Sequence, residues 1–134
     1  QCAAHLLLTI PIQFWDESEI WAPVPLHWIR RNDRGFNQSE LLARELASRL
    51  GLNPIKSLLK RIRHTPAQAG TGVRARAANV KNAFAINTHE EIPDRVLLID
   101  DVVTTGATVS ECARVLKLAG VQTIRVLSFA KAYQ

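Results

Sequence analysis

Residues 96–108 read VLLIDDVVTTGAT, and this stretch decides the fold class. Its first four residues, 96–99, form an unbroken apolar run, which is typical of a parallel strand that is covered on both faces. Two adjacent carboxylates follow, Asp100 and Asp101, and then a short run of small and hydroxylated residues. Ligands of doubly wound α/β folds bind at the carboxyl ends of such strands. The stretch therefore predicts a ligand site immediately after a buried strand.

The sequence that follows predicts a βαβ unit. Thr108 and Glu111 have the spacing of a capping box, and an apolar face runs over residues 109–119 until Gly120 ends the helix. Residues 123–129 are β-branched and apolar, and we expect them to form the neighbouring parallel strand.

Upstream, the best helix signal covers residues 37–50, with Asn37 as N-cap and Gly51 in position for a left-handed C-terminal cap. Residues 20–24 predict a weaker strand, because two prolines allow only a short one. Together these elements predict an α/β fold: a doubly wound, mainly parallel sheet with helices on both faces.

The composition indicates one domain over residues 1–134, because 134 residues with 47% apolar content suffice for one compact core. The chain contains no Met and begins with Gln1, so we expect it to be a piece of a longer protein. Cys2 and Cys112 lie far apart and outside any CxxC pair, which argues against a disulfide scaffold and against a zinc site. We expect Cys112 in the core, a cytoplasmic protein, and no membrane insertion, since the longest apolar stretch, residues 6–10, is too short to span a bilayer.

The net charge of +5 is unevenly distributed. Eight of the 17 Lys and Arg residues lie between Glu45 and Glu90, where no acidic residue occurs. Such a basic segment beside an acidic remainder indicates an anionic ligand, either a phosphorylated small molecule or nucleic acid. Within it, residues 65–79 show no helix or strand period until their last residues, and a loop this long is usually functional or disordered.

The residues after the acid pair have the chemistry of a phosphate site. Their backbone N–H groups, hydroxyls and helix N-terminus can hold a phosphate; they are Thr104, Thr105, Gly106, Ala107 and Thr108. Asp100 and Asp101 can accept hydrogen bonds from vicinal hydroxyls or hold Mg²⁺ through its waters. The alternative is a strand end followed by a polar turn, but the order of strand, acid pair, small-residue loop and helix favours a sugar-phosphate site.

This stretch resembles the phosphoribosyl pyrophosphate (PRPP) signature of the type I phosphoribosyltransferases. More narrowly, the chain resembles the ComF/GntX (competence protein F) family. Three blocks carry the narrower resemblance: VPLH at residues 24–27, RGFNQSELLA at 34–43, and RIRHTPAQ at 61–68 followed by Arg76, Asn79 and Val80.

The resemblance implies a role for each motif. Asp100 and Asp101 would contact the ribose hydroxyls, and residues 104–108 would bind the 5′-phosphate. The turn at residues 24–27 would bind pyrophosphate; the candidates there are Pro25, Leu26, His27 and Arg34, with Arg30 and Arg31 nearby. For the arginines, a solvated surface cluster is the alternative.

Residues 65–79 would be the flexible loop that closes over PRPP, and an ordinary surface loop is the alternative. Its candidate ligands are Arg61, Arg63, Gln68, Arg74 and Arg76. His27 and His64 could each donate a proton to a leaving group, or each could have a structural role only. Three tryptophans near the start could stack a base, but core or subunit contacts are the stronger interpretation; they are Trp15, Trp21 and Trp28.

Two functions follow from the resemblance. The first is Mg²⁺-dependent transfer of ribose 5-phosphate from PRPP to an unidentified acceptor, with pyrophosphate release. The second is a non-catalytic PRPP- or nucleotide-sensing or DNA-binding component of competence, whose partners would be single-stranded DNA or a competence helicase. A second copy of the chain is a further candidate partner. ComF-like proteins begin with a cysteine-rich zinc module that this sequence lacks, and residues 1–19 would be the remnant of a hood or linker.

Overall fold

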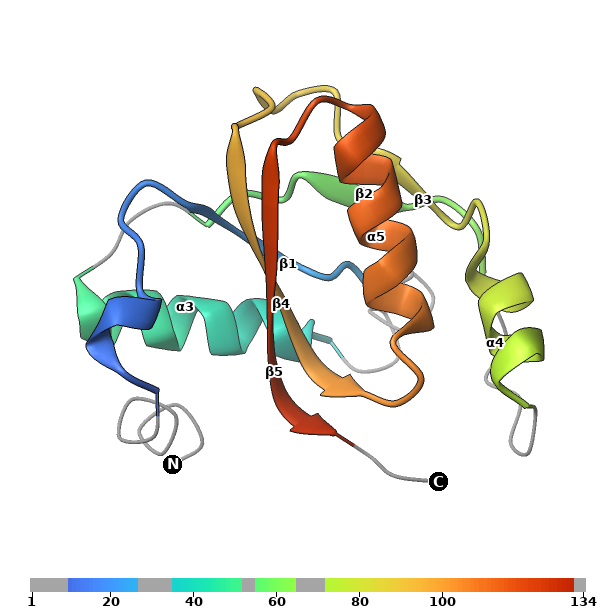
Figure 1. The fold of residues 1–134 in the computed structure, drawn as a ribbon, viewed down its shortest axis with the longest axis horizontal. Coiled ribbons are helices and arrows are strands. Elements are labelled where there is room, and N and C mark those ends of the chain that lie inside the picture. The colour runs from blue at the N-terminus through green and yellow to red at the C-terminus, as the bar shows by residue number, and fades with distance from the viewer. Residues whose placement is uncertain (1–9, 27–34, 52–54, 65–71, 132–134) are drawn as a thin grey trace.

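The computed structural model describes residues 10–26, 35–51, 55–64 and 72–131. Figure 1 shows the arrangement of the helices and strands. In chain order they are η1 (Ile12–Phe14), β1 (Ile20–Pro23), α3 (Gln38–Leu50), β2 (Leu59–Arg61), α4 (Val73–Val80), β3 (Phe84–Ile86), β4 (Arg95–Val103), α5 (Ala107–Leu118) and β5 (Thr123–Lys131).

The main sheet is parallel and has β4 at its centre, in the order β1-β4-β5. Val96 pairs with Ile20 on one side and with Ile124 on the other. The four residues 96–99 are fully buried, as their unbroken apolar run predicts. The strand continues to Val103, further than predicted, so the acid pair lies within the strand.

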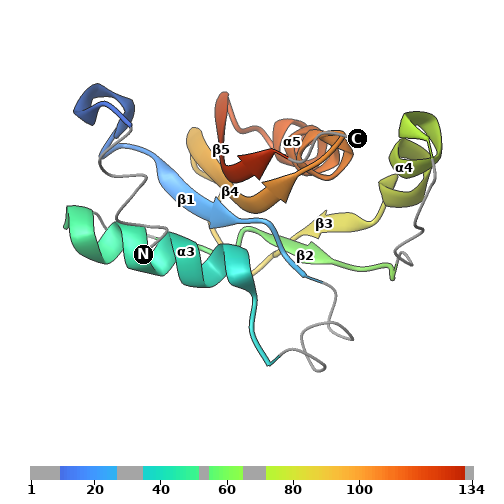
Figure 2. The same ribbon diagram turned by 90° about the horizontal axis from the view of Figure 1, so that it is seen from below.

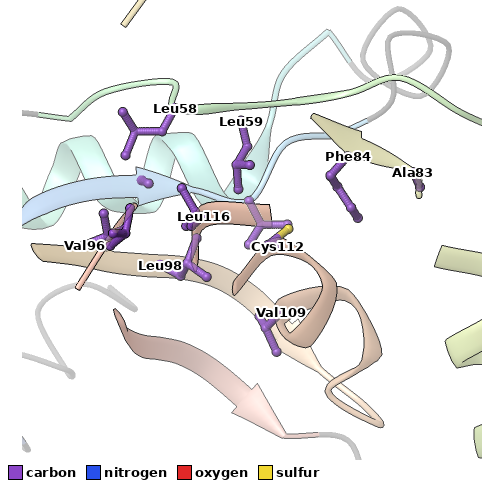
Figure 3. Close-up of a cluster of buried hydrophobic side chains, with 12 residues drawn as sticks. Leu58, Leu59, Ala83, Phe84, Val96, Leu98, Val109, Cys112 and Leu116 are labelled. Atoms are coloured by element: carbon purple, nitrogen blue, oxygen red, sulfur yellow. The ribbon is translucent and has the colours of Figure 1, made fainter. Parts of the chain in front are cut away.

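Two helices cover opposite faces of this sheet (Figure 2). Successive side chains of a strand point to opposite faces, and β4 follows this rule. Val96 and Leu98 pack with Cys112 and Leu116 of α5; Figure 3 shows this cluster. Leu97 and Ile99 pack on the other face with residues of α3, namely Ala43, Leu46 and Ala47. The predicted doubly wound α/β fold is therefore confirmed, as is the core position of Cys112.

Helix α3 has the ends that its sequence predicts. The side-chain oxygen of Asn37 accepts a hydrogen bond from the Ser39 N–H at 3.2 Å, which satisfies a donor of the first turn. Gly51 has φ 65° and its N–H donates to the Ala47 carbonyl, as in a left-handed C-terminal cap.

The predicted capping box of α5 is wrong. The helix begins at Ala107, after Gly106 at φ 79°, so Thr108 lies inside the first turn. The Glu111 carboxylate instead accepts hydrogen bonds from the Asn82 N–H at 2.9 Å and from the Arg114 guanidinium. The helix therefore begins earlier than predicted, directly after the turn at Gly106. The Glu111 carboxylate does not cap the helix, because it bonds to Asn82, which is distant in sequence.

A second, antiparallel sheet pairs β2 with β3, and the segment between these strands contains α4. The sequence predicts irregular structure over residues 65–79, whereas the structure has a helix over Val73–Val80; residues 65–71 lie outside the described part. The Arg63 guanidinium donates to the Asn79 and Lys81 carbonyls at 2.9 and 2.6 Å, so it satisfies acceptors at the C-terminal end of α4.

Three residues ahead of β1 pack against the sheet near the C-terminal end of α3 (Figures 1 and 2): Ile10, Phe14 and Trp15. Glu19 is buried, with 1% of its surface exposed, and its carboxylate forms a bidentate ion pair with Arg125 of β5. The Arg125 guanidinium also lies over the Phe14 ring, 4.3 Å from its centroid. Trp15 and Trp21 contact each other and belong to this core, as the sequence predicts; Trp28 lies outside the described residues.

In the ranges that the structure describes, no helix combines the length and the apolar character needed to cross a bilayer.

Candidate functional site

The acid pair lies near the carboxyl end of the central strand, within the strand, whereas the sequence predicts it after the strand. The backbone of β1 meets β4 at this point, since the Val24 N–H donates to the Ile99 carbonyl at 2.9 Å. The turn after β1, of which Pro25 and Leu26 are described, therefore begins beside Asp100. Parallel strands bring their carboxyl ends to one edge, and both predicted ligand segments meet at this edge.

Asp100 is a buried carboxylate with only 8% of its surface exposed. Its Oδ1 accepts hydrogen bonds from the Ser39 hydroxyl at 3.3 Å and from the Asp101 N–H at 3.0 Å. Burial, and then the neighbouring Asp101 charge, raise the pKa of Asp100 to about 6. The site therefore holds a carboxyl group that changes its charge near neutral pH.

Asp101 is more exposed than Asp100, and its backbone N–H bonds to the same residue, Ser39. Its N–H donates to the Ser39 oxygen at 3.2 Å, and its own Oδ1 accepts from the Val102 N–H at 2.9 Å. Sequence reasoning missed Ser39, which is 3% exposed and contacts both acidic residues. No local signal pointed to Ser39, because its two partners lie 61 and 62 residues away in the sequence.

The predicted phosphate loop surrounds a small pocket of about 30 Å³. Gly106 adopts a left-handed conformation there, and the Thr105 hydroxyl accepts a hydrogen bond from the Ala107 N–H at 3.3 Å. The first N–H groups of a helix lack partners within the helix, so the start of α5 presents donors to this pocket. All five predicted residues line it: Thr104, Thr105, Gly106, Ala107 and Thr108.

The acid pair lines a second pocket, of about 190 Å³, which shares Asp100, Val102 and Thr108 with the phosphate pocket. A third pocket of about 280 Å³ shares Arg61 and Asn37 with the second. Pro25 and Leu26, predicted to bind pyrophosphate, line both of these larger pockets. His27 and Arg34 lie outside the described residues, as do Arg30 and Arg31, so their predicted role stays a prediction.

The basic residues predicted for the loop separate into three groups. Arg61 belongs to β2 and lines the two larger pockets, with its guanidinium 5.2 Å from the centroid of the Phe84 ring. Arg63 bonds to carbonyls at the end of α4. Arg74 and Arg76 lie on α4 itself, and neither lines the pockets described above. Gln68 lies outside the described residues.

The residues present fit the predicted Mg²⁺. This ion is usually held by one or two carboxylates together with waters and ligand phosphates. Asp100 and Asp101 supply two carboxylates at the edge of an open pocket that adjoins the phosphate loop. Over the described ranges there is no group of three or more His, Cys, Asp or Glu residues that could form an all-protein metal cage.

Comparison with protein families gives a match to the phosphoribosyl transferase domain over residues 37–133. The matched range includes α3, β4 and α5, which carry Ser39, the acid pair and the phosphate loop.

Several curated relatives carry related names. Competence protein F of Haemophilus influenzae is 40% identical over 112 residues, which is 82% of this chain and 49% of that protein. DNA utilization protein YhgH of Salmonella typhi is 43% identical over 107 residues, 77% of this chain and 45% of the relative. Competence protein ComFC of Streptococcus pneumoniae is 31% identical over 108 residues, 81% of this chain and 46% of the relative.

The chain thus spans about half the length of the curated relatives it matches. The family match covers α3, β2, β4 and α5, which line the three pockets together with residues 23–26 ahead of the matched range. Two of these relatives carry competence names, as the sequence motifs predict. The chain belongs to the phosphoribosyl transferase domain family, as a ComF-like member of it.

Proposed function

We propose that the protein binds PRPP with Mg²⁺ and transfers its 5-phosphoribosyl group to an acceptor, with release of pyrophosphate. One observation carries the proposal. A small pocket at the start of α5 lies next to a pocket that the acid pair lines, and the two share Asp100, Val102 and Thr108. PRPP has two adjacent parts that match these two pockets: a 5′-phosphate and a ribose ring that bears two hydroxyls.

Each part of the ligand has chemical partners in this arrangement. The start of α5 and the hydroxyls of Thr104 and Thr105 take the 5′-phosphate, because N–H groups and the positive end of a helix favour an anion. Asp100 and Asp101 accept hydrogen bonds from the two ribose hydroxyls. The pyrophosphate extends toward Pro25, Leu26 and Arg61, along the two larger pockets.

In the transfer itself, the bond between C1′ and the pyrophosphate oxygen breaks, and a bond forms between C1′ and the acceptor, which loses a proton. Positive charge develops on the ribose, and the carboxylates beside it stabilise that charge. Arg61 lies on the side of the departing pyrophosphate and offsets its charge. Bound Mg²⁺ would add further neutralisation of the pyrophosphate. Holding both reactants in the pocket supplies much of the remaining acceleration.

Calorimetry with PRPP and Mg²⁺ tests binding, and pyrophosphate release across purine, pyrimidine and pyridine acceptors tests turnover. The double variant Asp100→Asn with Asp101→Asn should lose PRPP binding while remaining folded. Asp94→Asn, which removes an exposed carboxylate just before β4, is the matched control and should bind as the wild type does. Unchanged affinity in the double variant would remove the central claim, and absence of pyrophosphate release over the whole panel would remove the enzymatic part.

A second candidate function is a non-catalytic role in DNA uptake, in which the domain senses PRPP or a nucleotide or binds single-stranded DNA. The basic segment between Glu45 and Glu90 favours it, and so do the printed names of the relatives. Binding of single-stranded DNA should then weaken steeply with salt.

Arg74 and Arg76 test the DNA-binding version best, because both lie on α4 outside the pockets. Arg74→Ala with Arg76→Ala should weaken DNA binding and reduce its salt dependence. Arg44→Ala with Arg49→Ala removes the same charge from α3, where both arginines pair with glutamates, and serves as the control. Equal losses in the two double variants would indicate a non-specific charge effect and contradict a binding surface on α4.

A further inference from the structure

We propose that the first turn of α3 positions the two halves of the PRPP site relative to each other. Ser39 fixes the acid pair, and Asn37 fixes the turn after β1 against the same helix. The inference rests on the proposed function, because it assigns positioning residues to that site. Both residues also line the pocket of the acid pair, and the inferred role is the one they exert through the acid pair and through the turn after β1.

Ser39 is the common partner of both acidic residues. Its hydroxyl donates to Asp100 Oδ1, and its oxygen accepts from the Asp101 N–H. The Asp101 N–H also donates to Asp100 Oδ1, so the three groups form a closed set of hydrogen bonds. Both of these bonds to the Asp100 carboxylate are made to the same oxygen, Oδ1. The rotation of the carboxylate is thereby set before any ligand binds.

Asn37 connects the same helix turn to the end of β1. Its Nδ2 donates to the Val24 carbonyl at 3.1 Å, while its side-chain oxygen caps the Ser39 N–H. Val24 immediately precedes Pro25 and Leu26, which line the larger pockets. A continuous path of three residues, Val24, Asn37 and Ser39, therefore joins the pyrophosphate side of the site to the acid pair.

This path matters because PRPP spans both halves. A ligand that contacts two segments gains full affinity only when the segments stand at the spacing that the ligand requires, and prior fixing of that spacing reduces the ordering cost of binding. Ligands that occupy one half alone do not depend on the spacing. Ribose 5-phosphate and pyrophosphate are such half ligands, so they separate positioning from a general structural role.

Ser39→Ala tests the acid-pair end of the path. Alanine is a strong helix former, so α3 should persist. Each hydrogen bond of this kind is worth about a fivefold change in an equilibrium constant. We expect Ser39→Ala to weaken PRPP and ribose 5-phosphate by about tenfold and to leave pyrophosphate affinity, measured with Mg²⁺, unchanged. Ser48→Ala, an exposed position near the far end of the same helix, is the control and should alter none of the three.

Asn37→Ser tests the other end. Serine caps helices about as well as asparagine, but its shorter side chain cannot reach the Val24 carbonyl, so this variant removes the tether and keeps the cap. PRPP affinity should fall about fivefold, with less change for ribose 5-phosphate alone and for pyrophosphate alone. Urea unfolding of each variant checks that the fold is retained.

The outcomes separate the two proposals. A wild-type protein that fails to bind PRPP refutes the proposed function and this inference together. PRPP binding by the wild type, with equal binding by Ser39→Ala, refutes the inference alone. Equal losses for all three ligands in Ser39→Ala or in Asn37→Ser would show a general structural role and would also overturn the inference.

Discussion

Replacing Asp100 by asparagine should stabilise the protein when no ligand is bound, by an amount that depends on pH. The pKa of this carboxyl is raised from 3.8 to about 6, chiefly because the group is buried and then because Asp101 repels it. Ionisation is therefore harder in the folded chain than in the unfolded one. The stability that the protonated carboxyl contributes is fully present below about pH 4, and it is lost as the pH rises through about 6.

The magnitude follows from the size of the shift. One pKa unit corresponds to ~1.4 kcal/mol, so a rise of about two units costs the ionised wild type ~3 kcal/mol of unfolding free energy. Asparagine keeps an oxygen that can accept from Ser39 and from the Asp101 N–H, and it carries no charge. Asp100→Asn should therefore match the wild type near pH 4 and exceed it by up to ~3 kcal/mol near pH 8.

Urea unfolding, followed by the fluorescence of the buried Trp21, measures the difference at several pH values in the presence of a chelator. Titrating groups that do not interact with Asp100 contribute equally to both proteins and cancel in the difference. Asp94→Asn should show no such pH-dependent gain. A stability difference between Asp100→Asn and the wild type that stays constant from pH 4 to pH 8 would refute the assignment of a strained, buried charge at this position.

Three further predictions concern other parts of the fold. Burial raises the pKa of the Cys112 thiol to about 12, so in a Cys2→Ser background the native protein should react with a thiol reagent at pH 8 far more slowly than the urea-unfolded protein; equal rates would contradict this core position. Gly106→Ala forces a residue with a side chain into a left-handed conformation at φ 79°. It should lower the free energy of urea unfolding by ~1 kcal/mol and weaken ribose 5-phosphate binding. Unchanged affinity would argue against a phosphate loop at this position. Arg125→Met leaves Glu19 buried without its partner and should cost ~3 kcal/mol in thermal or urea unfolding, with part of the loss recovered when Glu19→Gln is added; the absence of any recovery would contradict a charge effect.

Local sequence signals predicted the parts of the fold that depend on neighbouring residues. The apolar run at residues 96–99 identified the central strand because both of its faces are buried, and nothing but apolar side chains suits such a strand. Asn37 and Gly51 defined α3 correctly because caps satisfy donors and acceptors within the same helix turn. The loop at residues 104–108 was singled out because its small residues follow the acid pair closely, and the structure places all five around one pocket.

The missed features depend on contacts between distant segments. Ser39 is 61 residues from Asp100 in the sequence, and no local pattern reveals that its hydroxyl turns toward the acid pair. Glu111 matched a capping box by spacing, but its carboxylate bonds to Asn82, 29 residues away. Helix α4 has no buried residue and so lacks the apolar face by which helices are usually recognised in sequence.

The hydrogen bonds at the two ends of the segment between β2 and β3 are useful for protein engineering. Arg63 closes this segment at one side by bonding to the Asn79 and Lys81 carbonyls, and Glu111 of α5 holds Asn82 at the other. Because these bonds hold the two ends of the segment in place, the sequence between them is a natural unit for grafting. Exchanging it among ComF-like relatives while keeping Arg63 and Asn82 should yield chimaeras that share one core and one acid pair and differ in this segment alone.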